Sequence, residues 1–291
     1  MYTQLVELIK EAAPSGFPSA TELMLKYIYS TDNLLDIIKQ IGIIPECFTH
    51  DSTEEKLFSK ASDAVLSRAF RELGLKSTII TKRADSADVL VESPMHGYTL
   101  VADAKAFRLS RTAKNPKDFK VTALSGWRNE ADADYAVLCS PFFQYPQERS
   151  QIYKQAIDDN VALASWEHIM YLVEHNVKES ETISLAPVWN FCDEYSRRIV
   201  VSESKRCFIS EYSRFIIELF AFAQNDFSDL LNSQIEIIMQ RGSVERGYWE
   251  NKKAEIHAYS REMATEELVK SMKIDEKISQ IEAYVRGLRN A

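Results

Sequence analysis

Residues 87–105 read ADVLVESPMHGYTLVADAK, a pattern typical of two strands joined by a tight turn. Its two apolar runs predict the strands, and the Ser-Pro-Met-His-Gly segment at 93–97 predicts the turn. Side chains alternate between the faces of a strand, so Asp103 and Lys105 should project from the same face. Pairing within the hairpin brings Asp88 alongside them. The hairpin is therefore expected to gather two carboxylates and one ammonium in a small volume.

This set of groups suits the Mg²⁺-dependent cleavage of a phosphodiester. Carboxylates are the hard oxygen ligands that Mg²⁺ requires, and a nearby lysine can orient the attacking water or offset developing charge. The alternative is a solvated strand face, which is the commoner origin of an Asp-x-Lys triplet. The apolar residues 100–102 lead directly into Asp103, so this acid is expected at the end of a buried strand. A carboxylate there needs a charged partner, for which either Lys105 or a metal would serve, and this favours the functional interpretation over a solvated strand face.

The composition is that of an ordinary globular protein. The chain has 291 residues, of which 45% are hydrophobic, enough for one large domain or two small ones. No apolar stretch is long enough to span a membrane, and the first residues do not resemble a signal peptide, so we expect a cytoplasmic protein. The four cysteines form no C-x-x-C pair and are expected to be reduced packing residues. Glycine-rich phosphate loops and G-x-S-x-G are absent, which disfavours nucleotide-dependent chemistry and that class of hydrolase.

A basic segment follows the predicted hairpin. The formal net charge of the chain is −8, which by itself argues against a nucleic-acid partner. Residues 103–128 nevertheless hold seven basic and two acidic residues, a local excess of five positive charges. A solvated loop would explain this segment equally well, but its position beside a candidate metal site favours a surface that faces DNA.

Helices are predicted before the hairpin. The first fifty residues show helical stripes with a turn near 30–33 and a stop at Gly42. Ser52-Thr53-Glu54-Glu55 matches a capping box, and the helix that it opens should end at Gly74. Two interpretations of Glu55 compete, because its carboxylate could cap the helix or could serve as an accessory acid beside the metal site.

The remainder of the chain predicts an α/β core with a mixed sheet flanked by helices, followed by a helical C-terminal region. Strands are expected at 134–139 and 161–166, with helices at 151–157, from 167, and through most of the chain beyond about 202. We expect a single domain over 1–291. Its catalytic core should cover about 50–170, with helical additions at about 1–45 and 200–291.

Several strings of residues resemble the HindIII family of type II restriction endonucleases. They are EKLFSKA at 55–61, VADAK at 101–105, FRLSRTAKN at 107–115, KDFKV at 117–121, DYAVL at 134–138 and PFFQYP at 141–146. The similarity runs strongly from about Ile41 to Trp166 and more loosely through the helical C-terminal third.

The resemblance implies a restriction-endonuclease-like core with a PD-(D/E)xK site. In that pattern the first acid is Asp88, the second is Asp103 and the lysine is Lys105, while Ala87 stands where the motif has proline. Asp88, Asp103 and the carbonyl of Ala104 are then expected to bind Mg²⁺, and Lys105 is expected to position the attacking water.

The resemblance also implies a homodimer that cuts palindromic double-stranded DNA at AAGCTT after the first A, leaving 5′ overhangs and 5′-phosphates. A bacterial restriction enzyme of this kind needs a cognate DNA methyltransferase. We expect Asn115 to contact an adenine edge, with Lys117 as the second choice and Asp118 orienting Lys117 or a neighbouring arginine. The other candidate DNA-binding residues are Arg108, Arg111, Lys114 and Lys120.

The residues leave two questions open, namely whether the stretch 81–86 contacts DNA and whether the protein has a related but different function. The stretch 81–86 differs from the family and leaves its DNA contacts undecided. A repair-type nuclease on the same core, or a non-catalytic DNA-binding dimer, would carry many of the same features.

Overall fold

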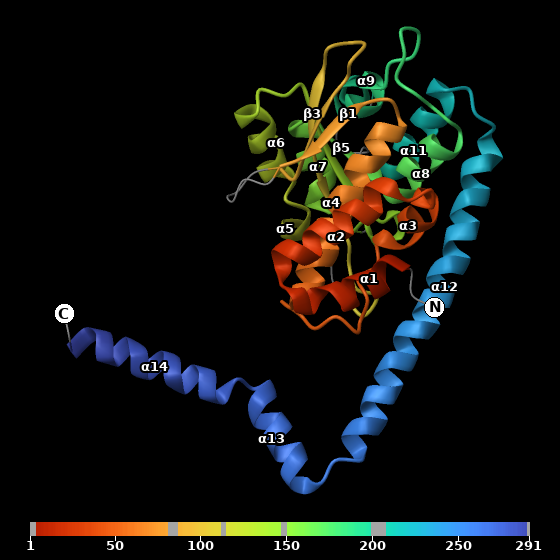
Figure 1. The fold of residues 1–291 in the computed structure, drawn as a ribbon. Helices are drawn as coiled ribbons and strands as arrows, with labels where there is room; N and C mark the ends of the chain where they lie inside the picture. The colour runs from red at the N-terminus through yellow and green to blue at the C-terminus, as the bar shows by residue number, and fades with distance from the viewer. Residues whose placement is uncertain (1–3, 81–86, 112–114, 147–149, 199–207, 290–291) are drawn as a thin grey trace. The chain divides into compact units, whose positions relative to one another are not determined.

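The computed structural model describes residues 4–80, 87–111, 115–146, 150–198 and 208–289 (Figure 1). The chain divides into two compact units, residues 1–242 and residues 243–291. The expectation of a single domain with helical additions stays a prediction.

A mixed five-stranded sheet lies at the centre of the first unit, with its strands in the order β1-β2-β3-β4-β5. The first three strands pair antiparallel, whereas β3 with β4 and β4 with β5 pair parallel. This architecture confirms the predicted α/β core. The strands are β1 (Lys76–Ile79), β2 (Val89–Glu92), β3 (Thr99–Ala104), β4 (Tyr135–Ser140) and β5 (Val161–Ser165).

The hairpin of β2 and β3 forms as the alternating pattern predicts. Its register pairs Val89 with Ala102, and Gly97 adopts a φ of 71° in the turn, a conformation that favours glycine. The strand itself begins at Val89, so Asp88 comes one residue before β2. Strand β1, which extends this sheet, was not predicted, because four residues that include a lysine, a serine and a threonine carry little apolar signal.

The basic segment contains helices where a long loop was expected, and that expectation was wrong. Asn115 begins the short helix α5 (Pro116–Phe119) by accepting a hydrogen bond from the Lys117 amide, and Pro116 occupies the first helical position. Lys120 then takes a left-handed φ of 49° and separates α5 from α6 (Val121–Glu130). Helix α6 packs a short apolar face against β3 and β4. The helix was not predicted because the lysines and polar residues of this stretch weaken its apolar periodicity.

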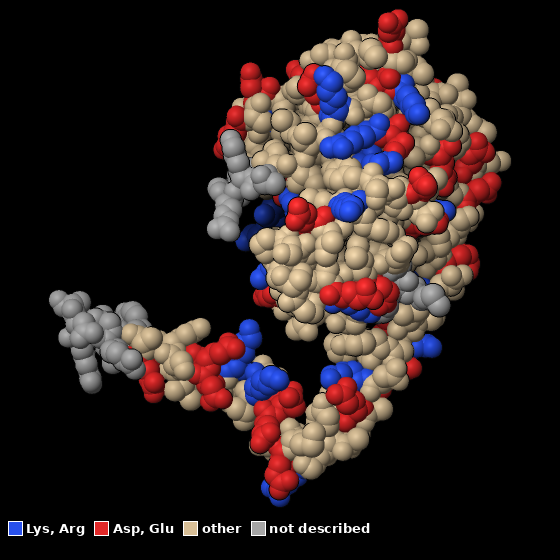
Figure 2. Space-filling view, in the orientation of Figure 1, with Lys and Arg blue, Asp and Glu red and all other residues tan. Residues whose placement is uncertain are grey.

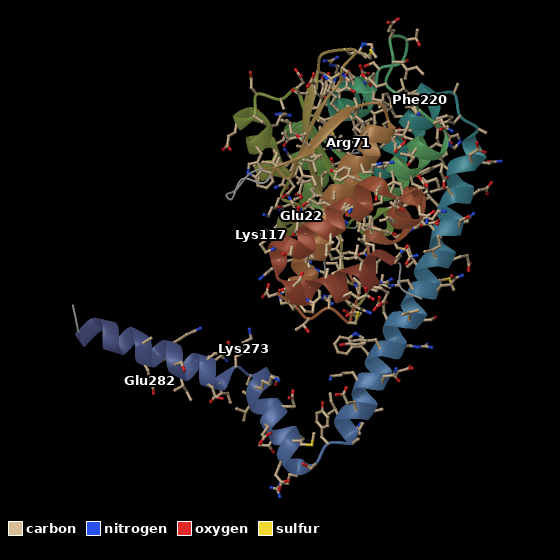
Figure 3. All side chains as sticks on the ribbon, in the orientation of Figure 1. Glu22, Arg71, Lys117, Phe220, Lys273 and Glu282 are labelled. Carbon is tan, nitrogen blue, oxygen red and sulfur yellow. The ribbon has the colours of Figure 1, made fainter. Side chains whose placement is uncertain are left out.

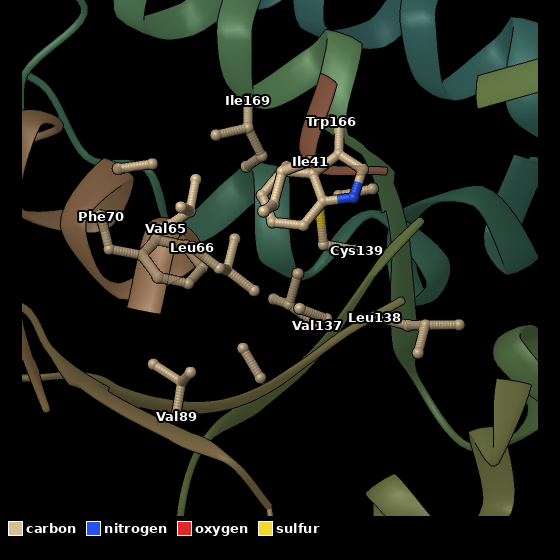
Figure 4. Packing of buried hydrophobic residues seen from close by; sticks show 14 of the residues in the cluster. Ile41, Val65, Leu66, Phe70, Val89, Val137, Leu138, Cys139, Trp166 and Ile169 are labelled. Atoms are coloured by element: carbon tan, nitrogen blue, oxygen red, sulfur yellow. The ribbon is translucent and has the colours of Figure 1, made fainter. Parts of the chain in front are cut away.

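Helix α4 (Thr53–Glu72) packs against the first three strands of the sheet. Figure 4 shows Val89 and Val137 pointing toward Val65, Leu66 and Phe70 of this helix. The Ser52 hydroxyl accepts a hydrogen bond from the Glu55 amide at 3.2 Å, which confirms the predicted N-cap. Because α4 is buried along most of its length, any polar side chain on its inner face is held against the sheet edge.

The other helices of the first unit agree with the predicted helical character of both flanks of the core. Arg71, near the end of α4, donates two hydrogen bonds to the Ser77 carbonyl and so joins this helix to β1 (Figure 3). The remaining helices are α1 (Gln4–Ala12), α2 (Phe17–Ser30), α3 (Leu34–Ile41), α7 (Gln151–Asp158), α8 (Trp166–Glu174), α9 (Ala186–Trp189), α10 (Phe191–Arg198) and α11 (Phe208–Leu219).

The second unit is helical, as predicted. It contains the end of α12 (Gln224–His257), followed by α13 (Arg261–Ser271) and α14 (Ile274–Arg289). In the part of the chain that the structure describes, no helix has both the length and the apolar composition needed to cross a bilayer. Cys139 and Cys192 are buried free thiols, Cys47 is a half-buried free thiol, and Cys207 lies outside the described residues.

Glu167 at the start of α8 makes the stability of the fold sensitive to pH. This carboxyl is buried and accepts a hydrogen bond from the Phe142 amide, and burial raises its pKa from 4.5 to about 7. Between these values the native state binds more protons than the unfolded state, so stability falls as pH rises through this window. The total loss should be about 3 kcal/mol.

We therefore expect Glu167→Gln to be more stable than the wild type at about pH 8 and nearly equal to it at about pH 5. Urea unfolding at the two pH values measures the difference. The matched control is Glu174→Gln, an exposed acid on the same helix. A stability difference that is the same at both pH values would contradict this prediction.

Candidate active site

Three carboxylates converge at one end of the hairpin. Asp103 lies on β3, and the hairpin register, continued by one pair beyond Val89 and Ala102, places Asp88 opposite it. Asp63 reaches the same place from α4. One oxygen from each of these three carboxylates lies within 4.8 Å of the others. We call Asp63, Asp88 and Asp103 the acid cluster.

Asp63 is the member of the acid cluster that the sequence analysis missed. It lies in the buried part of α4, where only 5% of its surface is exposed. Burial raises the pKa of Asp63 well above its ordinary value, and the nearby Asp88 carboxylate adds to the effect. The sequence offered one signal, an acid between Ser62 and Ala64 in a largely apolar stretch of the helix. A sequence alone does not show which part of the sheet that face of the helix packs against.

Lys105 completes the predicted catalytic set. Its Nζ lies 2.5 Å from Asp103 Oδ2, and the Asp103 side chain is almost fully buried. Burial raises the pKa of Asp103, while the Lys105 ammonium acts in the opposite direction. The predicted gathering of Asp88, Asp103 and Lys105 is therefore present.

The backbone of Lys105 is held on both sides. Its N–H donates to the Cys139 carbonyl on β4 at 2.7 Å, and its carbonyl accepts a hydrogen bond from the Trp166 indole at 3.0 Å. Ala104, whose carbonyl was predicted as a metal ligand, is the last residue of β3 and is buried beside the acids. These contacts fix the end of the strand from which the lysine projects.

The acid cluster fits a hard divalent cation. Its donors are carboxylate oxygens, which Mg²⁺ and Mn²⁺ prefer. Asp103 Oδ2 is buried and, within the described residues, accepts no well-aligned hydrogen bond despite its close contact with Lys105. Two of the three acids have raised pKa values, so a cation that enters the cluster would stabilise charges that burial disfavours. The arrangement suits stabilisation of a phosphate group and activation of a water.

Comparison with known proteins agrees with this geometry. Residues 19–285 match the HindIII restriction endonuclease family. The chain is also 40% identical over 289 residues to the type II restriction enzyme HindIII of Haemophilus influenzae, an alignment that covers 99% of this chain and 96% of the relative. The chain belongs to the HindIII restriction endonuclease family. It is accordingly a type II restriction endonuclease, a site-specific deoxyribonuclease.

Glu55, the predicted accessory acid, lies outside the acid cluster of this HindIII-family chain. It precedes Asp63 by eight positions on the same helix, which corresponds to about 12 Å along the axis. Its carboxylate accepts a hydrogen bond from the Asp51 amide and pairs with Arg108 Nη2 at 2.6 Å. Although burial opposes ionisation, the Asp51 amide and Arg108 lower the pKa of Glu55. The Ser52 amide donates to the Thr49 carbonyl, so the Glu55 carboxylate does not complete the predicted capping box and bonds the preceding Asp51 amide instead. The catalytic role of Glu55 stays a prediction.

Arg108 also has its donors directed at protein groups. Besides Glu55, its guanidinium donates to the carbonyls of Pro45 and Phe48 at 2.8 and 2.7 Å. These contacts join the segment after β3 to the loop before α4. The expected DNA contact of Arg108 stays a prediction.

Asp118 organises the start of α5. It pairs with Arg111 Nη2 at 2.5 Å and accepts a hydrogen bond from the Asn115 amide. The Asn115 side-chain oxygen caps the helix by accepting a hydrogen bond from the Lys117 amide, and the expected base contact of Asn115 stays a prediction. Lys117 is exposed and lies at the edge of the first unit in Figure 3. Lys114, another predicted DNA contact, lies outside the described residues.

Lys120 is a residue of the basic segment whose charge acts on the acid cluster. Its ammonium lowers the pKa of Asp103, the acid whose pKa burial raises, and it lies 5.6 Å from the centroid of the Trp127 ring. A surface groove of about 660 Å³ runs beside this lysine, lined by residues of α5, α6 and α7 that include Asn115 and Lys117. Elsewhere, Figure 2 shows acidic and basic side chains interspersed over the face of the first unit that it presents. The groove therefore carries two lysines, and the charge of one of them acts on Asp103.

Proposed function

We propose that this restriction endonuclease uses Mg²⁺ to cleave both strands of the palindrome AAGCTT after the first A. The products carry 5′ overhangs with 5′-phosphates. The observation that carries the proposal is the convergence of Asp88, Asp103 and Lys105 in a chain that is 40% identical to HindIII along nearly its whole length.

The acid cluster would hold the metal, together with the Ala104 carbonyl. When bound, a divalent cation supplies charge that stabilises the phosphate and acidifies a water. Lys105 then orients the attacking water and offsets the charge that develops in the transition state. In-line displacement leaves a 3′-hydroxyl and a 5′-phosphate. Lys120, an exposed lysine whose charge lowers the pKa of Asp103, would contact the phosphate backbone.

The proposed enzyme works as a homodimer with a two-fold axis matched to its palindrome, so that each subunit cuts one strand. A cognate methyltransferase protects the DNA of the bacterial cell in whose cytoplasm it acts. Digestion of a plasmid of known sequence tests the proposal. Discrete fragments whose mapped ends fall at A/AGCTT are expected, and they require Mg²⁺.

Two other functions give different results in this assay. A repair-type nuclease would produce ends unrelated to AAGCTT, and a non-catalytic DNA-binding dimer would retard DNA on a gel without Mg²⁺-dependent products. Either result would overturn the proposed function.

Asn115 is expected to read an adenine. Asn115→Asp keeps an acceptor for the N-cap of α5 but removes the amide donor, so the helix should survive while the base contact is lost. Cleavage of AAGCTT should slow by about 5- to 150-fold, from a contact of about 1–3 kcal/mol. Cleavage rates on a short duplex measure this effect. Asn129→Asp, at an exposed position on α6, is the matched control for the added charge, and equal rates for the two variants would contradict the assignment.

A further inference from the structure

Lys60 lies against the acid cluster and has no role in the proposed mechanism. Its Nζ lies 3.6 Å from Asp63 Oδ2 and 3.8 Å from Asp88 Oδ1, and it also lies 3.5 Å from the Ile80 carbonyl. Its side chain is 20% exposed, so these contacts are partly shielded from water. Lys60 is three residues before Asp63 on α4, a spacing that puts both side chains on one face of the helix.

The ion pairs of this region divide the acid cluster between two lysines. Lys105 pairs with Asp103, whereas Lys60 pairs with both Asp63 and Asp88. Three neighbouring carboxylates repel one another, and buried charges are costly without a partner. Lys60 opposes the raised pKa of Asp63 through this charge. The positive charge of Lys60 thus neutralises the same two carboxylates that a divalent cation would neutralise.

We infer that Lys60 is an internal counter-ion that holds Asp63 and Asp88 together when no metal is bound, and that a metal ion must displace it from them. This inference rests on the proposed function, since it assumes that the acid cluster is the metal site. It assigns Lys60 a positioning role: the lysine keeps the metal-free site assembled at the expense of metal affinity.

The test compares Lys60→Met with Lys56→Met. Lys56 lies one turn earlier on α4 and is exposed, so its replacement makes the same change of charge and shape away from the acids. Binding of Mn²⁺ to each protein without DNA is measured by electron paramagnetic resonance. Loss of the Lys60 ammonium should lower the Mn²⁺ dissociation constant by about tenfold, while Lys56→Met should stay close to the wild type. Lys60→Arg, which keeps the charge, should restore the wild-type affinity.

A second readout is the thermal stability of the metal-free proteins. Without a counter-ion the three carboxylates repel one another, so Lys60→Met should melt about 3 °C below Lys56→Met. Saturating Mn²⁺ should remove this gap.

Two outcomes would overturn the inference, and they are distinguishable from one another. If the wild type binds Mn²⁺, and Asp103→Asn abolishes that binding, an unchanged or higher dissociation constant in Lys60→Met refutes the counter-ion role alone. If the wild type binds no Mn²⁺ that depends on Asp103, the acid cluster is not the metal site, and both this inference and the proposed mechanism fail.

Discussion

Asp103→Asn should cleave AAGCTT at a rate lower than that of the wild type by about 1,000-fold or more. The change removes the charge of the carboxylate that Lys105 contacts and that lies within 4.8 Å of the other two acids. It keeps the shape of the side chain, so the hairpin should still fold. Affinity for duplex DNA should be retained or increased, because a negative charge is removed from the place where a phosphate would lie.

Single-turnover cleavage and a gel-shift assay measure the two effects of Asp103→Asn separately. Glu92→Gln is the matched control, because Glu92 is an exposed acid on β2 whose partner is Lys76 on the surface of the sheet. The control should cut at the wild-type rate. Cleavage by Asp103→Asn within a few-fold of the wild type would contradict the assigned site.

Asp63→Asn is expected to have the second largest effect, a loss of about 100-fold in cleavage rate. Asp63 brings the third carboxylate to the cluster from a different element, so its loss leaves the Asp103–Lys105 pair intact while weakening metal binding. The variant should therefore need more Mg²⁺ to reach half of its maximal rate. Because burial raises the pKa of Asp63, the neutral amide should be tolerated by the fold.

Cleavage rates across a Mg²⁺ titration measure the effect of Asp63→Asn. Glu72→Gln provides the control on the same helix, since its partner there is Arg68 rather than the acid cluster. A wild-type Mg²⁺ dependence in Asp63→Asn would exclude Asp63 from the metal site.

The hairpin part of the site was predictable because its information is local. Alternation along β3 puts Asp103 and Lys105 on one face, and a short turn fixes which residue lies opposite, so Asp88 follows from the same few residues. The parallel strands β4 and β5 were predictable for a similar reason, since both are continuous apolar runs bounded by polar residues.

The contribution of α4 to the site was not predictable in the same way. Periodicity identified this helix and its cap, but the choice between Glu55 and Asp63 depends on how far along the sheet edge the helix lies. That position is set by packing of the helix, including Val65 and Phe70, against the first three strands of the sheet, which is tertiary information (Figure 4). Lys60 could not be assigned for the same reason, because its partner Asp88 is 28 positions away in the chain.

Anomalous diffraction from a crystal soaked with Mn²⁺ tests the central claim most directly. The account predicts a peak bounded by the carboxylates of Asp63, Asp88 and Asp103, with the Lys105 ammonium beside it. Among the described residues, a second group of possible ligands exists at His50, Asp51 and Glu55. A peak at that group with none at the hairpin would contradict the account, since it would leave the acids of the hairpin without the ion that their chemistry requires.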